Sequence, residues 1–411
     1  MVFSFLSASF LSASFLGKAT MKKIKQKLAG ERSTRWRRTL IVMGSLLGLA
    51  MGVAGCSESD RPLEPPVRFD GNIFGTFYQV TIMDPLTLGE SLDLEEGFKA
   101  ELESVDQAMS TYRDDAELIA FNEAPLEEWQ PLSNELIEVL AISQSVAEAS
   151  HGAFDITVGD LVNLWSFGPG ARTEVEPSDD VLAEQLTQVG FDALEIDSQN
   201  MQARRTRDVF VDLSGVAKGH ATDRVAAYLN QQGIEHYLVN LGGDLIARGL
   251  RDEEEQTPWR IGIEVPEDGQ QRAQHIIPLE SMSVATSGDY RNYFEVDGQR
   301  FSHTIDPRTG RPVTHQLASV SVFHPSNAWA DAWATALLVV GEEDAIQMAL
   351  DNSLKVLMLV REGDEWRSIA SPEFIDYFGE TLVNELGIEQ FSTSPSPTTN
   401  TAPAVQPVTG E

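Results

Sequence analysis

The spacing of apolar residues changes repeatedly between residues 67 and 360, and it predicts a mixture of helices and strands. In 92–109 apolar residues recur at every third or fourth position, which is typical of a helix with one buried face. In 67–83 apolar and polar residues alternate, which predicts two strands joined as a hairpin. Further helices are expected at 134–149, 178–190, 217–231, 327–340 and 342–351. Further strands are expected at 192–197, 208–213, 236–241, 244–248, 259–265, 316–323 and 354–360.

The order of these elements indicates the fold class. Strands and helices alternate irregularly, with hairpins as well as crossovers, whereas a doubly wound sheet requires a regular alternation. We therefore predict an α+β fold. No linker long enough to divide the chain interrupts residues 67–385, so this region is expected to form one domain of two closely packed halves. Ser133 is expected to cap the helix that follows it.

The N-terminal region has the order of a bacterial lipoprotein signal. Residues 22–38 are rich in Lys and Arg, 40–54 are mostly apolar, and small residues precede Cys56. We interpret 1–55 as the signal region, Cys56 as the acylated mature N-terminus, and 56–66 as a lipidated linker. The alternative is a transmembrane anchor, but fifteen apolar residues fall short of the roughly 20 that span a bilayer.

Two further segments are expected to lie outside the folded domain. Residues 1–20 repeat Phe-Leu-Ser-Ala-Ser ahead of a conventional start at Met21, and we interpret them as a mis-assigned start. Residues 386–411 end in a tract of Ser, Thr and Pro, which cannot bury enough apolar surface to order a chain. That segment is predicted to be a disordered tail.

Composition limits the chemistry of the exported part. Cys56 is the only cysteine, so disulfides and cysteine nucleophiles are excluded, and metal ligands must be oxygen or imidazole. Residues 57–411 carry 21 basic and 62 acidic residues, a net charge near −41. Proteins that bind nucleic acid need basic residues against its phosphates, so we exclude nucleic acid as a partner.

The run Asp-Leu-Ser-Gly-Val-Ala-Lys-Gly at 212–219 is the most informative motif. It joins an apolar, strand-like segment to a helix-like one. Backbone N–H groups at a helix N-terminus favour negative charge, and glycine lets a ligand approach the backbone, so a phosphate-bearing ligand fits this junction. The run matches neither a Walker loop nor a dinucleotide-binding turn. On spacing alone, a tight turn with a salt-bridged lysine explains it equally well.

Seven other segments accompany this run. They are Phe-Gly-Thr-Phe-Tyr at 74–78, Met-Ser-Thr-Tyr-Arg at 109–113, Gly-Ala-Phe-Asp-Ile-Thr at 152–157, Asn-Leu-Trp-Ser-Phe-Gly at 163–168, Asn-Leu-Gly-Gly-Asp at 240–244, Ser-His-Thr-Ile-Asp-Pro-Arg-Thr-Gly at 302–310 and Ala-Asp-Ala-Trp-Ala-Thr-Ala-Leu at 330–337. In this order the set resembles the ApbE family, the FAD:protein FMN transferases of the bacterial cell envelope, over roughly residues 67–380. The resemblance implies an ApbE-like domain with the FAD site between its two halves.

Asp331 and Thr335 lie four residues apart in an alanine-rich helix, so both side chains project from one face. A carboxylate and a hydroxyl so placed suit Mg²⁺, which takes few protein oxygens and adds substrate phosphates. The alternative is a buried aspartate that bonds a neighbouring hydroxyl or backbone group. The resemblance implies that both residues hold magnesium, together with the backbone of Gly215 and with Ala334.

The resemblance also implies the residues that contact FAD. Tyr112 would lie against the flavin, and ordinary packing at a helix end is its alternative role. Phe74 stands where the family usually has Met, and Asp155 would line the FAD or serve only as a turn acid. The full set implied for FAD is Phe74, Tyr112, Ala153, Phe154, Asp155, Asp212, Lys218 and Ile305.

His303 is the leading candidate for a proton acceptor, because a near-neutral imidazole can take a hydroxyl proton at working pH. A lone histidine is more often structural, but the resemblance implies that this one lies near the pyrophosphate of FAD. Asp244 follows two glycines, and we interpret it as a second catalytic residue. A solvated acid in a hairpin turn is the alternative for Asp244.

The reaction that the resemblance implies depends on Mg²⁺. A threonine hydroxyl of a partner protein attacks the FMN phosphorus of FAD, and AMP leaves. One rival is an FAD pyrophosphatase, in which water replaces threonine, and another is a non-catalytic flavin-binding lipoprotein. Flavin-accepting subunits of membrane redox complexes are the expected partners, which favours a lipid anchor on the periplasmic side of the inner membrane. Ser57 in place of an aspartate after the cysteine favours the outer membrane instead.

Overall fold

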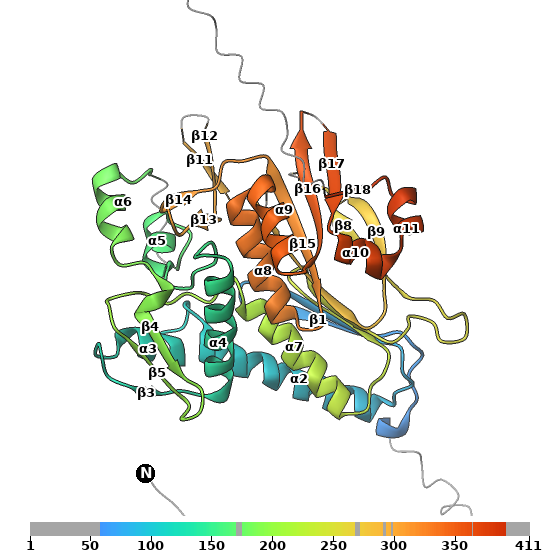
Figure 1. The fold of residues 1–411 in the computed structure, drawn as a ribbon. Coiled ribbons are helices and arrows are strands. Elements are labelled where there is room, and N and C mark those ends of the chain that lie inside the picture. The colour runs from blue at the N-terminus through green and yellow to red at the C-terminus, as the bar shows by residue number, and fades with distance from the viewer. Residues whose placement is uncertain are drawn as a thin grey trace, which may run out of the picture. The chain divides into compact units, whose positions relative to one another are not determined.

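The computed structural model describes residues 58–169, 175–267, 272–290, 293–296, 299–363 and 365–391 (Figure 1). The predicted signal region, Cys56 and residues 392–411 lie outside this part. Contacts divide the chain into residues 1–61 and 62–411, and the first unit contributes a 3-10 helix, η1 (Glu58–Asp60). In the second unit the backbone N–H of Leu63 donates to the carbonyl of Leu86. This domain therefore begins a few residues before the predicted start at 67.

The second unit is built on a nine-stranded sheet. Its strands follow the order β1-β2-β6-β7-β10-β15-β16-β17-β18 and are antiparallel except for the last pair. The bounds are β1 (Val67–Ile73), β2 (Thr76–Ile82), β6 (Tyr237–Leu241), β7 (Asp244–Arg248), β10 (Met282–Gly288), β15 (Leu317–His324), β16 (Lys355–Glu362), β17 (Glu365–Ala370) and β18 (Glu389–Gln390). Smaller sheets pair β8 (Trp259–Glu264) with β9 (Ala273–Leu279), β11 (Tyr293–Val296) with β12 (Gln299–Ser302), β13 (Ile305–Asp306) with β14 (Arg311–Pro312), and β5 (Gln202–Arg205) with β3 (Gln130–Pro131) and β4 (Leu194–Asp197).

Helices accompany this mostly antiparallel sheet, which confirms the predicted α+β class. They are α2 (Leu88–Met109), α3 (Glu117–Glu123), α4 (Asn134–Ala149), α5 (Gly159–Leu164), α6 (Asp179–Leu186), α7 (Ala217–Gln231), α8 (Asn327–Val340), α9 (Glu342–Asp351), α10 (Pro372–Phe378) and α11 (Glu380–Glu385). Helix α2 begins earlier than predicted because Thr87 and Glu90 form a capping box, in which each side chain accepts from the other residue's backbone N–H. Helix α4 has its predicted bounds, and Ser133 caps it by accepting from the N–H of Leu136.

Alternate residues of β16 face two separate apolar cores. Val356 and Met358 join the larger core, to which α2, α4, α7 and α8 contribute. Leu357 and Leu359 join a second core with side chains of β8, β9 and α10. Figure 1 shows α7 and α8 lying over one face of the sheet. Burial on both faces explains why this strand reads as a continuous apolar run.

The segment 208–213 was predicted as a strand, and that prediction is wrong. Val209, Val211 and Leu213 are buried, so the alternation does report which residues face the core. The segment forms only an isolated parallel bridge, between Phe210 and Val158, and not a ladder of strand pairs. On its other side the backbone bonds a side chain. Asn122 accepts from the N–H of Val211 at 2.8 Å and donates to its carbonyl at 2.9 Å. The spacing of apolar residues reveals burial but not the partner of the backbone.

The C-terminal boundary predicted at 385 also differs from the structure. Ile388 and Phe391 are buried, and β18 pairs with β17 at the edge of the sheet. The fold therefore continues through Phe391, because burial of these apolar side chains stabilises the segment.

Candidate active site

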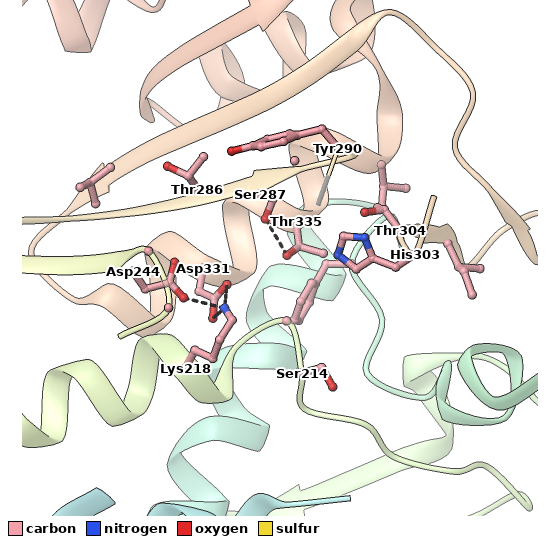
Figure 2. Close-up of a pocket in the computed structure, with 18 of the residues that line it drawn as sticks. Ser214, Lys218, Asp244, Thr286, Ser287, Tyr290, His303, Thr304, Asp331 and Thr335 are labelled. Carbon is pink, nitrogen blue, oxygen red and sulfur yellow. Dashed lines mark hydrogen bonds and ion pairs between the residues drawn. The ribbon is translucent and has the colours of Figure 1, made fainter. Parts of the chain in front are cut away.

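A cavity of about 450 Å³ opens beside the start of α7 and the middle of α8. Its walls come from residues 153–158, from the loop that leads into α7, from the β6–β7 turn and from β8, β10 and α8 (Figure 2). The predicted site residues that line it are Ala153, Phe154, Asp155, Asp212, Gly215, Lys218, Asp244, His303, Ile305, Asp331 and Thr335. Segments that lie far apart in the sequence thus meet around one space.

Lys218 links two buried carboxylates in this cavity. Its Nζ lies 2.6 Å from Asp244 Oδ2 and 3.3 Å from Asp331 Oδ2. Burial raises the pKa of Asp331, the charge of Asp244 raises it further, and Lys218 opposes both. Burial by itself lowers the pKa of Lys218, but the two carboxylates outweigh burial and raise it above its ordinary value. The ammonium group therefore stays charged and holds the two acids together.

Asp331 and Thr335 project from one face of α8 into the cavity, as their spacing predicts (Figure 2). Asp331 Oδ2 accepts from the backbone N–H of Gly219 at 3.1 Å, and Thr335 Oγ1 lies 3.1 Å from Ser287 Oγ. A Cβ at Gly215 would lie 3.4 Å from Thr335 Oγ1, so the backbone of Gly215 borders the same space.

These oxygens fit a hard cation. Mg²⁺ binds through one or two carboxylates, keeps several waters and takes further ligands from substrate phosphates. Asp331 supplies the carboxylate and Thr335 the hydroxyl, and the cavity beside them leaves room for a phosphate-bearing substrate. Within the described ranges, no group of three or more His, Cys, Asp or Glu side chains could hold a metal ion by itself.

Two other predicted carboxylates, those of Asp212 and Asp155, accept hydrogen bonds from the loops in which they lie. Asp212 accepts from the backbone N–H of Ser214 at 2.7 Å and from its hydroxyl, which shapes the turn ahead of α7. Asp155 accepts from the backbone N–H and hydroxyl of Thr157 and from the N–H of Phe191. Burial raises the pKa of Asp155, although these hydrogen bonds oppose the shift. The contacts match the turn-acid alternative for Asp155, which nevertheless borders the cavity.

His303 and Ile305 flank the junction between β12 and β13. Figure 2 shows the imidazole of His303 pointing toward Thr335. The rings of His303 and Phe167 also pack edge to face, with centroids 6.3 Å apart. Ile305 belongs to a third apolar core with Trp165. The imidazole therefore stands at the cavity wall on a packed support, where it can meet a bound ligand.

Three predicted residues do not line the cavity. Tyr112 follows α2 and is 70% exposed. Phe74 occupies the β1–β2 turn with a φ of 52° and packs against the larger core, and Ala334 is buried within α8. The aromatic residue of this region that does border the cavity is Phe77, from the same motif as Phe74.

The cavity also includes residues that the sequence did not single out. Thr286 and Ser287 on β10 line it, as does Tyr290 just beyond that strand (Figure 2). The available signal was the run Ala-Thr-Ser-Gly-Asp-Tyr at 285–290, in which small polar residues follow an apolar segment.

Comparisons with known proteins find relatives of this chain in sequence and in fold. A family model described as the ApbE family matches residues 74–358. The FAD:protein FMN transferase of Vibrio cholerae serotype O1 is 40% identical over 338 residues, which cover 82% of this chain and 98% of the relative. That of Klebsiella pneumoniae is 37% identical over 336 residues, which cover 80% of this chain and 95% of the relative.

The solved flavin transferase ApbE from Vibrio cholerae superposes with a TM-score of 0.70 at 38% identity, over 76% of this chain and 99% of that one. The apo flavinyl transferase ApbE of Pseudomonas stutzeri gives 0.69 at 35% identity, over 77% and 98%.

Proposed function

This chain belongs to the ApbE family and transfers FMN from FAD to a protein, and we propose that the acceptor is a threonine hydroxyl, that AMP leaves and that Mg²⁺ is required. The observation that carries the proposal is the meeting of Lys218, Asp244, Asp331, Thr335 and His303 around one cavity. A lysine, buried carboxylates, a hydroxyl and an imidazole supply the charge and the proton acceptor that phosphoryl transfer needs.

The proposed chemistry forms one bond and breaks one bond. The threonine oxygen attacks the FMN phosphorus, the bond from that phosphorus to the bridging oxygen breaks, and AMP departs with that oxygen. His303 accepts the hydroxyl proton. Lys218 brings its positive charge toward the pyrophosphate, while Asp244 keeps the ammonium group in place.

Asp331 and Thr335 would hold Mg²⁺, with the backbone of Gly215 and the adjoining Ala334 as further candidates. When bound, the ion supplies neutralisation of the charge on the phosphate oxygens. Phe154 and Phe77 are two aromatic residues of the cavity lining that suit a flat ring. Phe74 and Tyr112 remain the family-based candidates for the flavin.

For its location we propose a lipid anchor at Cys56 that holds the enzyme on the periplasmic side of the inner membrane, near flavin-accepting subunits of membrane redox complexes. The support is the basic, apolar and small-residue order that precedes Cys56. In the part of the chain that the structure describes, no helix has the length and apolar character needed to cross a membrane. The outer membrane is the alternative location.

The test incubates the protein with FAD, Mg²⁺ and a candidate acceptor, followed by in-gel flavin fluorescence and chromatography of the nucleotides. We expect a fluorescent acceptor band and one AMP per FMN attached, and no band when the acceptor threonine is changed to valine. Free FMN and AMP without a band would identify a pyrophosphatase. Unchanged FAD would identify a binding protein.

A further inference from the structure

Helix α8 carries Asp331 and Thr335, yet its first turn is capped from another helix. Ser326 is the N-cap residue, but its side chain does not bond the helix. Its hydroxyl donates instead to Asp223 Oδ2 on α7, at 2.7 Å. The same carboxylate accepts from the backbone N–H groups of Asn327 at 2.7 Å and Ala328 at 3.0 Å. A negative charge is favourable at this end of a helix, so Asp223 ties α7 to the start of α8.

Asn327 extends this tie into the sheet. The residue is fully buried, and its amide donates to the carbonyls of Leu245 at 2.9 Å and Val284 at 3.1 Å. Leu245 on β7 and Val284 on β10 form the last pair of these two strands on the side of the cavity. Beyond that pair come the cavity residues Asp244 and Ser287. Asn327 therefore fixes α8 at the point from which the cavity walls begin.

Gly219 sets how closely the two helices approach. A Cβ at this position would lie 2.4 Å from the carbonyl oxygen of Asn327, so only glycine permits the contact. At this separation the N–H of Gly219 reaches Asp331, and Lys218 reaches the same carboxylate. A shift of α8 along α7 would disturb both contacts at once.

We propose that Asp223, acting through the first turn of α8, is a positioning residue that places Asp331 and Thr335 for the reaction. Asp223 does not line the cavity, so it acts on the reaction only through the two helices that it joins, α7 with Lys218 and α8 with Asp331 and Thr335. The inference rests on the proposed function for its activity measurement. Catalytic groups are sensitive to placement, since an error of about 1 Å can cost on the order of 100-fold in rate.

The test compares Asp223→Ala and Asp223→Asn with the unaltered protein. We expect Asp223→Ala to lower kcat by about 10- to 100-fold and to raise the Mg²⁺ concentration at half-maximal rate, with KM for FAD changed by less than about threefold. Asp223→Asn should fall between, because one amide oxygen can still accept from α8. The thermal stabilisation by Mg²⁺ in the presence of FAD should weaken in the same order.

Asp84 offers a matched control. Its carboxylate also accepts from two consecutive backbone N–H groups, those of Glu235 at 3.1 Å and His236 at 2.8 Å, but it does not line the cavity and bonds neither α7 nor α8. Asp84→Ala should lower the unfolding temperature and leave kcat and the Mg²⁺ requirement unchanged. Equal losses of kcat in Asp84→Ala and Asp223→Ala, or an unchanged kcat in Asp223→Ala, would overturn the inference. If the unaltered protein attaches no FMN, the proposed function fails, and the Mg²⁺-dependent thermal shift with FAD still decides the role of Asp223.

Discussion

At the scale of single residues, the site depends on charges that compensate one another. Lys218 faces Asp244 and Asp331, whose side chains are almost fully buried. Removal of one member of a buried ionic group leaves the others uncompensated, so a truncation at Lys218 or Asp244 would mix loss of function with loss of stability. Asp331 can be changed more cleanly, because Asp244 remains as the partner of Lys218.

We predict that Asp331→Asn abolishes Mg²⁺-dependent transfer while the protein stays folded. The amide keeps the size of the carboxylate but loses the charge that a hard cation requires. Transfer is measured by acceptor fluorescence over a range of Mg²⁺ concentrations, and folding by circular dichroism. Thr335→Ser keeps the hydroxyl and is expected to retain activity, whereas Thr335→Ala should lose it. Undiminished transfer by Asp331→Asn at limiting Mg²⁺ would contradict the metal assignment.

His303→Ala tests the proton acceptor. Since a positioned general base contributes roughly 10²- to 10⁴-fold, we expect single-turnover transfer to fall by this amount and the Kd for FAD to change much less. His151→Asn is the control, because His151 is exposed and does not line the cavity. Parallel losses in rate and in FAD affinity would make His303 a ligand-binding residue instead.

At the scale of helices and strands, most predictions succeeded where apolar residues mark the buried positions of an element. Helix α7 has its predicted bounds because its apolar residues keep a helical spacing. Strand β10 escaped prediction, although it lies at the centre of the sheet, because it reads Met-Ser-Val-Ala-Thr-Ser-Gly. Its polar side chains are satisfied by neighbours that only the fold supplies, such as the carbonyl of His324 for Ser283. The site residues on β10 were missed for the same reason.

The side chain of Asn122 bonds both backbone polar groups of the buried Val211, and this gives a prediction of stability. Asn122→Ala would leave the N–H and carbonyl of Val211 buried without partners. We expect the free energy of unfolding to fall by about 2–4 kcal/mol, measured by urea denaturation. Asn200→Ala, in an exposed turn, should change it by less than about 0.5 kcal/mol. A similar small change in both variants would show that Asn122 does not support the segment.

At the scale of the whole molecule, the sequence identified the members of the site better than their contacts. Eleven predicted residues line the cavity, because the order of several motifs together carries information that no single motif has. The pairing of Lys218 with Asp331, which are 113 positions apart, follows from the packing of α7 on α8 through Gly219 and could not be read from spacing. The exposed position of Tyr112 likewise depends on the loop after α2 and not on its motif.

The last prediction concerns attachment to the membrane. The basic segment, the short apolar segment and the Gly55-Cys56 junction form one ordered signal, so Cys56 should carry lipid. We expect labelled palmitate to enter the protein and a density gradient to place it with the inner membrane, where the proposed acceptors lie.

Ser57→Asp should keep the label and strengthen inner-membrane retention, because an aspartate after the lipidated cysteine favours the inner membrane. Cys56→Ser should lose the label and leave the membrane. Its fifteen apolar residues are fewer than the roughly 20 that a helix needs to span a bilayer. A Cys56→Ser protein that stays firmly membrane-bound would refute the lipid anchor, and wild-type protein in the outer-membrane fraction would refute the inner-membrane location alone.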